Sequence, residues 1–309
     1  MNKKTLIILF VIFIFLGVVA SFSWWSKCLR LDKKTIIDTE LSFSMFTKGA
    51  TSKISILKEG EEEKIIKKEN GLWKINGFDA SQKAIDDFFK ALSELSIKSL
   101  VSRNPENHAN FEIDEKNGIT LTMVKDNIIS TFIIGRQGTT FNSFYAKIKG
   151  GNNVYEVSGM LRDKLLQSVT FWRDKIIVNV PREIIQKIEV VSDTNPLTVT
   201  KNKDIWTAKR FDKTAILDEA TANRLIATFN PLEASGFLNE EKQKEFQNAK
   251  DKIIIFIYGS DNKPLAEINL FEKDDEWWGQ VDGKDIFYTI SPYKFSDVLL
   301  KDEDIFGVK

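Results

Sequence analysis

Apolar and polar residues alternate along most of this chain, behind an N-terminal run that shows no alternation. That run extends from Thr5 to Trp25 and contains no charged residue. Most later apolar segments are short and have a period of two, which is typical of β-strands with one buried face. Two longer segments repeat apolar residues at spacings of three and four, the period of an amphipathic helix. The pattern predicts an α+β body that follows an apolar N-terminal segment.

The same series of predicted elements occurs twice. Trp73 lies in a short strand pattern, and Trp206 lies in a similar one 133 residues later. Five further strand patterns match at offsets of 133 to 136: residues 53–56 with 187–190, 119–124 with 253–258, 132–134 with 268–270, 144–146 with 277–279, and 154–158 with 287–291. Because order and spacing are kept over so many elements, duplication explains the pattern better than chance does.

One amphipathic helix is predicted after the tryptophan strand of each copy. Ser81 and Asp218 stand where N-cap residues are expected. The apolar faces are formed by Ile85, Phe88, Phe89, Leu92 and Leu95 in the first copy and by Ala222, Leu225, Ile226 and Phe229 in the second. Asn70-Gly71 and Asp282-Gly283 separate strand patterns, and such pairs favour β-hairpins. We therefore expect each copy to be a mainly antiparallel sheet with flanking helices.

The predicted organisation is an N-terminal transmembrane helix followed by two tandem copies of this fold. Residues 1–34 form the membrane anchor and juxtamembrane segment, residues 35–174 the first α+β repeat, and residues 175–309 the second. No linker rich in glycine, serine or proline separates the copies near residues 170–175. We therefore expect the two repeats to pair closely and rigidly.

The apolar N-terminal segment has the length of a membrane span. Its 21 residues, 5–25, suffice for a helix that crosses the hydrocarbon core, since about 20 residues span roughly 30 Å. Trp24 and Trp25 suit the headgroup region. A cleaved signal peptide is the alternative, because the small residues from Val18 to Ala20 offer a cleavage site behind a basic start.

Two arguments about orientation oppose each other. Four basic residues follow the span between Lys27 and Lys34, whereas Lys3, Lys4 and the α-amino group precede it, which mildly favours a cytoplasmic body. Export of the N-terminus would move its charges against the membrane potential, at about 2.3 kcal/mol per charge per 100 mV. We expect the second effect to dominate. The protein is then a single-pass inner-membrane protein whose C-terminal body is extracytoplasmic, in the periplasm.

Composition and motifs give no support for nucleic-acid binding or catalysis. Lys plus Arg and Asp plus Glu both number 44, so the basic surplus of a nucleic-acid-binding protein is missing. Cys28 is the only cysteine and His108 the only histidine, which excludes an intrachain disulfide and a two-histidine metal site. The acidic runs 61–63 and 274–276 lack calcium-loop spacing, and residues 135–138 are too short for a phosphate loop. We expect no catalytic residues, no cofactor and no metal.

Trp277 and Trp278 are the candidate partner-binding residues. Adjacent side chains in a strand point to opposite faces, so we expect one ring in the core and the other exposed. An exposed tryptophan can anchor a protein partner or a glycan. Phe144 and Tyr145 occupy the same place in the first copy, which favours a packing role.

The chain resembles a bacterial family of domains of unknown function. Its members are membrane-anchored, duplicated-domain proteins found beside ABC-type permeases and gliding-motility-type transporter auxiliary proteins. The resemblance rests on the Lys3-Lys4 start, Trp73 after Asn70-Gly71, residues 132–135, 144–146 and 154–157, and Arg173-Asp174-Lys175 at the end of the first copy. The family's Phe-Gly-Leu turn stands here as Phe111-Glu112-Ile113. The resemblance implies an extracytoplasmic body and supplies no catalytic residues.

Two functions are consistent with these observations. The first is a non-enzymatic, membrane-anchored extracytoplasmic accessory protein that serves an ABC-type transporter or envelope assembly through protein binding. Its partners would be the lipid bilayer, through residues 5–25, and an ABC-type permease or auxiliary subunit. The alternative is an envelope glycan-binding protein or hydrolase that uses the Trp277-Trp278 region.

Overall fold

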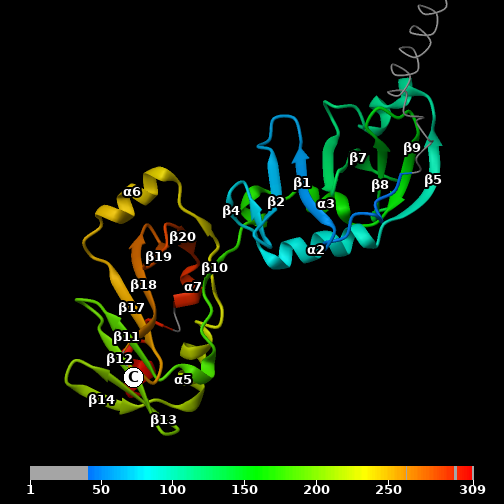
Figure 1. The fold of residues 1–309 in the computed structure, drawn as a ribbon. Coiled ribbons are helices and arrows are strands. Elements are labelled where there is room, and N and C mark those ends of the chain that lie inside the picture. Colours follow the sequence, from blue (N-terminus) through cyan, green and yellow to red (C-terminus); the bar gives the residue numbers. More distant parts are fainter. Residues whose placement is uncertain (1–40, 262, 296–297, 308–309) are drawn as a thin grey trace, which may run out of the picture.

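The computed structural model describes residues 41–261, 263–295 and 298–307. Figure 1 shows two lobes, and each lobe contains a nine-stranded antiparallel sheet. The α+β, mainly antiparallel class predicted from the sequence is confirmed. The predicted membrane segment, residues 5–25, lies outside the described residues. Among the described helices, none has the length and apolar character needed to cross a membrane.

The two sheets have the same strand order. The first runs β4 (Phe78–Asp79), β3 (Leu72–Ile75), β2 (Lys64–Glu69), β1 (Thr51–Leu57), β6 (Ile119–Lys125), β7 (Ile128–Gln137), β8 (Ser143–Ile148), β9 (Val154–Ser158), β5 (Ser96–Ser102). The second runs β14 (Lys213–Ile216), β13 (Ile205–Arg210), β12 (Leu197–Asn202), β11 (Lys187–Val191), β17 (Ile253–Tyr258), β18 (Pro264–Lys273), β19 (Glu276–Val281), β20 (Phe287–Ile290), β16 (Gly236–Phe237). In the first copy the last edge is the strand directly after the main helix, and in the second copy it is the second strand after that helix.

Each sheet buries one face under its main helix. In the first copy this helix is α2 (Gln82–Ser93), and Ser81 Oγ accepts a hydrogen bond from Ala84 N at 3.3 Å. In the second copy it is α5 (Glu219–Ala227), and Asp218 Oδ1 accepts from Thr221 N at 3.0 Å. Both predicted N-caps are therefore confirmed. The apolar side chains predicted for the helix faces pack into the two main cores.

Eight further helices complete the described part of the lobes. They are η1 (Pro105–Asn107), η2 (Ala109–Phe111), α3 (Leu161–Leu165), α4 (Val169–Trp172), η3 (Arg182–Ile184), α6 (Glu240–Asn248), α7 (Pro292–Phe295) and α8 (Asp302–Phe306). At the end of the first copy, the Trp172 ring is fully buried and lies 5.7 Å from the Phe88 ring. The last helix of the first repeat thereby closes the core beneath α2.

The opposite faces of the sheets carry smaller apolar clusters that differ between the copies. In the first copy the cluster includes Ile113 and Tyr145, beneath the turn that follows η2. Glu112 in this turn has φ +53°, a left-handed conformation that favours glycine. In the second copy Phe246 of α6 covers the cluster instead. The sequence pattern did not predict α6, because Phe246 is its one buried side chain.

Candidate functional site

The structure buries both candidate tryptophans. Trp277 is 5% exposed in the main core, with its ring 5.5 Å from that of Phe295. Trp278 is 3% exposed on the other face, where it packs with Phe246. Its Nε1 donates to Glu276 Oε2 at 2.7 Å. The prediction of opposite faces is confirmed, but the prediction of one exposed ring is wrong because α6 covers that face. A role in partner binding stays a prediction.

His108 holds two loops of the first copy together. Its Nε2 lies 3.2 Å from the Asn152 carbonyl oxygen, and its Nδ1 lies 3.3 Å from Lys147 Nζ. Burial lowers the pKa of Lys147. Within the described residues, no group of three or more histidine, cysteine, aspartate and glutamate side chains could hold a metal ion. The contacts of His108 are those of a structural residue.

The segment that connects the two repeats hydrogen-bonds to both of them. On the first repeat, Arg173 forms a bridge with Ala80, and Asp174 N donates to Asp79 O at 2.8 Å. On the second, Ala234 N donates to Lys175 O at 2.8 Å. The segment continues as β10 (Ile176–Val178), which pairs with β15 (Leu232–Glu233). The predicted domain boundary between residues 174 and 175 falls within this shared segment.

Arg173 lies between aromatic rings from the two repeats. Its Cζ is 3.8 Å from the ring centroid of Phe78 in β4 and 3.4 Å from that of Phe237 in β16. Both rings belong to edge strands, one from each sheet. A guanidinium stacked on an aromatic face is attracted by the ring quadrupole, by about 0.5–2 kcal/mol. The side chain therefore joins two segments that are far apart in the sequence.

Arg173 also carries an unsatisfied donor. Its Nε is buried and has no hydrogen-bond partner among the described residues, and burial lowers the pKa of the guanidinium. A buried donor without an acceptor costs about 1–3 kcal/mol. Trp73 Nε1, at the same junction, is likewise buried without a partner. Both donors would be stabilised if a rearrangement or a bound group supplied an acceptor.

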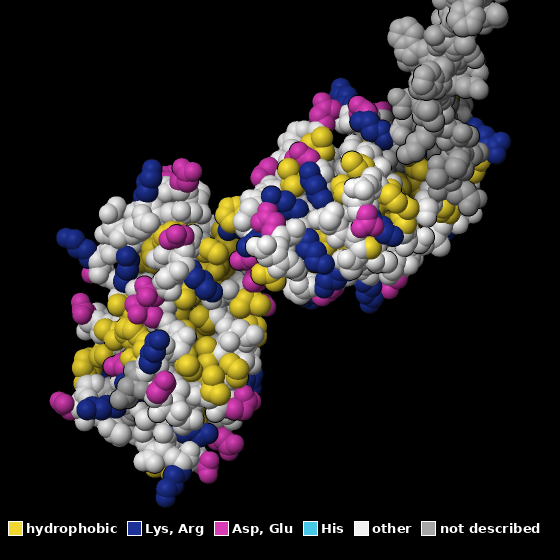
Figure 2. Space-filling view, in the orientation of Figure 1, with side chains coloured by type: hydrophobic (Ala, Val, Ile, Leu, Met, Phe, Trp, Pro, Cys, Tyr) yellow, Lys and Arg dark blue, Asp and Glu magenta, His cyan; other side chains and the backbone are white. Residues whose placement is uncertain are grey.

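A cleft of about 780 Å³ opens beside Arg173 between the repeats, and we call it the junction cleft. Leu72 and Ile176, which line it, are 63% and 38% exposed. A second hollow of about 290 Å³ is lined by Arg173, Lys284 and other residues of both repeats. Figure 2 shows that apolar side chains reach the junction and that basic and acidic side chains are mixed on the visible face. The junction thus presents apolar walls and an incompletely hydrogen-bonded guanidinium.

Comparison with known protein families shows to which family the chain belongs. The model of a family described as a domain of unknown function, DUF4340, matches residues 72–251. The chain belongs to the DUF4340 family. No curated protein and no solved structure matches it. The DUF4340 match begins at β3 and ends just before β17, so it contains Arg173 and both stacked phenylalanines, whereas Lys284 of the second hollow lies outside it.

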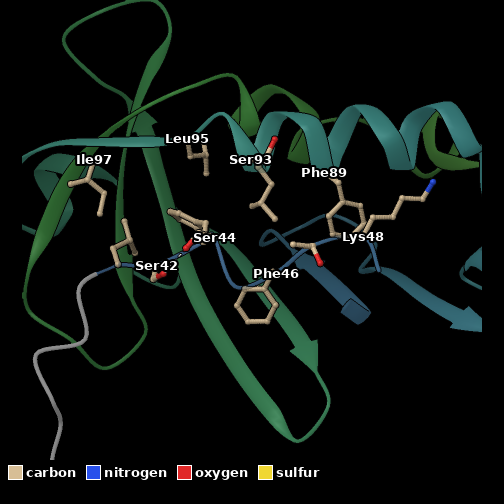
Figure 3. A pocket seen from close by; sticks show the side chains of 12 residues that line it. Ser42, Ser44, Phe46, Lys48, Phe89, Ser93, Leu95 and Ile97 are labelled. Carbon is tan, nitrogen blue, oxygen red and sulfur yellow. Dashed lines mark hydrogen bonds between the residues drawn. The ribbon is translucent and has the colours of Figure 1, made fainter. Parts of the chain in front are cut away.

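A cavity away from the junction, the N-terminal pocket, lies at the start of the described chain. It has a volume of about 440 Å³ and is lined by residues between 41 and 48 and between 89 and 97. Figure 3 shows Ser42, Ser44 and Phe46 of the chain start opposite Phe89 and Ser93 of α2. The DUF4340 match covers the α2 side of this pocket and not the chain start.

The sequence pattern gave little warning of either cavity. Arg173 lies in the motif at the end of the first copy, whereas no motif marks its two aromatic neighbours. Phe78 and Phe237 lie in strands of two residues, which are too short to show a period. The missing linker between the copies was the one signal that pointed to a structured junction.

Proposed function

We propose that this protein is a non-enzymatic accessory protein, anchored in the inner membrane with its body outside the cytoplasm. It binds a component of an ABC-type transporter or of another envelope assembly. The apolar segment 5–25 supports the anchor. The resemblance to proteins found beside ABC-type permeases supports the kind of partner.

The junction cleft is the observation that carries the binding role. Exposed apolar side chains, Leu72 and Ile176, lie there beside Arg173, which is incompletely hydrogen-bonded. Arginine is enriched among the residues that dominate binding energy at protein interfaces, and apolar contacts exclude water around them. The cleft volume of about 780 Å³ lies within the range of about 300–1,000 Å³ typical of ligand sites. A short segment of a partner protein fits these properties.

Site-specific photo-crosslinking in native membranes tests the proposal. A photoreactive residue is placed at Leu72, at the cleft, or at Ile129, which is 69% exposed in β7 and does not line the cleft. We expect Leu72 to capture a transporter component and Ile129 to capture none. Equal capture at both positions, or capture of no membrane protein at Leu72, would overturn the proposal.

Substitution of Arg173 sharpens this test. Arg173→Met keeps an apolar stem between the two rings and removes the charge and the N–H donors. We expect crosslinking from Leu72 to fall in Arg173→Met and to persist in Lys53→Met, a control at an exposed residue of β1 outside the cleft. If both variants crosslink like the parent protein, the guanidinium plays no part in binding.

A further inference from the structure

The N-terminal pocket occupies a place that the second repeat closes. There, β10 pairs with β15, the segment that follows α5, and Val180 N donates to Phe229 O at 2.9 Å. By the sequence offset between the copies, Phe43 and Phe46 of the first repeat correspond to Ile177 and Val180 of the second. In the first repeat no strand pair joins the described chain start to the residues after α2. The pocket lies between these two segments, where the second repeat has backbone hydrogen bonds.

The pocket walls are apolar. Five of the side chains that line it are at most 7% exposed: Leu41, Phe43, Phe46, Phe89 and Leu92. Ile97, on edge strand β5, also lines it and is 42% exposed. A cavity with such walls gains most from an apolar occupant, since each buried methylene contributes about 0.8 kcal/mol.

The polar side chains of the pocket are already hydrogen-bonded within the protein. Ser42 and Ser44 contact each other through their Oγ atoms at 3.2 Å, and Ser93 Oγ donates to Lys90 O at 2.8 Å. Lys48 Nζ is paired with Asp86 Oδ1 at 2.5 Å. Each of these groups already has one partner in the protein, and the buried part of the wall consists of apolar side chains. The pocket therefore favours a ligand without hydrogen-bonding groups over its buried length.

The start of the described chain places this pocket near the predicted membrane anchor. Leu41 follows Trp25, the last residue of the predicted span, by 16 residues. A chain of that length reaches at most about 58 Å when fully extended, at about 3.3–3.6 Å per residue. We propose that the N-terminal pocket takes up one acyl chain of a membrane lipid. This inference rests on the membrane anchoring proposed above.

Photolabelling with a lipid tests the inference. The full-length protein is reconstituted into phosphatidylcholine vesicles that contain phosphatidylcholine with a diazirine near the end of one acyl chain. After irradiation, labelled peptides are located by mass spectrometry. We expect label in peptides that cover residues 41–48 and 89–97, and none in the matching residues 176–180 and 229–234.

Two variants fill the pocket in different ways. Ile97→Trp places a ring in the wall on β5, and Ser93→Trp does so from the end of α2. Each should reduce pocket labelling about tenfold, which corresponds to about 1.4 kcal/mol in affinity. Ile205→Trp, at a 53% exposed isoleucine of β13 in the second repeat, should leave labelling unchanged. Because Ser93 is exposed, Ser93→Trp keeps the test valid if Ile97→Trp fails to fold.

The outcomes separate the two proposals. Label confined to residues 5–25 would keep the anchor and overturn the lipid pocket. Absence of label from residues 5–25 would overturn the anchor itself. Pocket label that both filling variants leave unchanged would mean that the acyl chain contacts the outer surface, and it would overturn the inference. A pocket filled by another segment of this chain or by a partner peptide would also remain unlabelled.

Discussion

The two repeats share one strand order but differ where the chain enters each of them. In the second repeat the entering strand, β10, pairs with β15 and closes the space beside α5. In the first repeat the described entering segment begins at Leu41 and borders a pocket of about 440 Å³. The nine strands therefore fix the scaffold of each repeat, whereas the segments before the first strand and after the main helix decide whether a cavity forms.

Removal of a core ring should produce the largest effect. Phe88 on α2 and Leu225 on α5 are both fully buried at equivalent places in the two cores. Phe88→Ala should lower the free energy of unfolding by about 3–5 kcal/mol and Leu225→Ala by about 2–5 kcal/mol. Urea denaturation followed by tryptophan fluorescence measures both. A loss below about 1 kcal/mol for Phe88→Ala would contradict an equivalent core in the first repeat.

Loss of Arg173 should loosen the junction without disrupting either core. Arg173→Ala removes the contacts with Phe78 and Phe237, which lowers the free energy of unfolding. It also removes an unsatisfied buried donor, which partly offsets this loss, so we expect a net decrease of about 1–2 kcal/mol. Limited proteolysis between residues 170 and 180 should become faster and release two stable halves. An unchanged cleavage rate would show that the shared strand alone holds the repeats together.

Low pH should lower the stability of the first repeat through protonation of Glu156. The corresponding residue of the second repeat is Thr289, which does not titrate. Side-chain hydrogen bonds from Thr139 and Ser143, at 2.6 and 2.8 Å, lower the pKa of Glu156. Because the folded pKa lies below the unfolded one, the stabilisation is complete above about pH 4.3 and is lost as the pH falls through the folded pKa.

Urea midpoints at pH 7 and at pH 3.5 measure this effect. The parent protein should lose more stability between the two pH values than Glu156→Gln, which cannot titrate. If the two proteins lose the same amount, the carboxylate of Glu156 makes no net contribution in the folded state.

The smallest effect should come from the turn at Glu112. Its φ of +53° disfavours a residue with a Cβ, so Glu112→Gly should raise the stability by at most about 1 kcal/mol. Thermal unfolding, compared with Glu106→Gly in η1 of the same loop, measures the gain. A lower melting temperature for Glu112→Gly would show that contacts of the glutamate outweigh the relief of strain.

The sequence predicts the repeated strands and helices well. It predicts poorly which segments cover the faces of the sheets. Trp73 and Trp206 mark equivalent hairpins because a buried ring in alternating strands produces a strong pattern. The caps at Ser81 and Asp218 are equally local. The burial of Trp278 depends on α6, a polar helix whose single buried residue, Phe246, gives no helical period.

Neither the junction cleft nor the N-terminal pocket can be predicted from the periodic pattern of apolar residues. The Arg173 contacts join three segments that lie far apart in the chain, and β4 and β16 contain two residues each. Near the N-terminal pocket, Leu41 and Phe43 alternate with serines much as residues of a strand would. Whether that segment pairs with a neighbour depends on the residues after α2, so the pocket follows from tertiary structure.

Hydrogen exchange of the two entering segments tests the difference between the repeats most directly. Backbone amides of residues 176–180 take part in pairing with β15 and in the bond to Phe229 O, so we expect slow exchange there. Amides of residues 41–45 should exchange much faster in detergent solution. They should slow when the protein is reconstituted with lipid. Equal and strong protection of both segments in detergent would contradict the account, because it would mean that the first repeat is closed in the same way as the second.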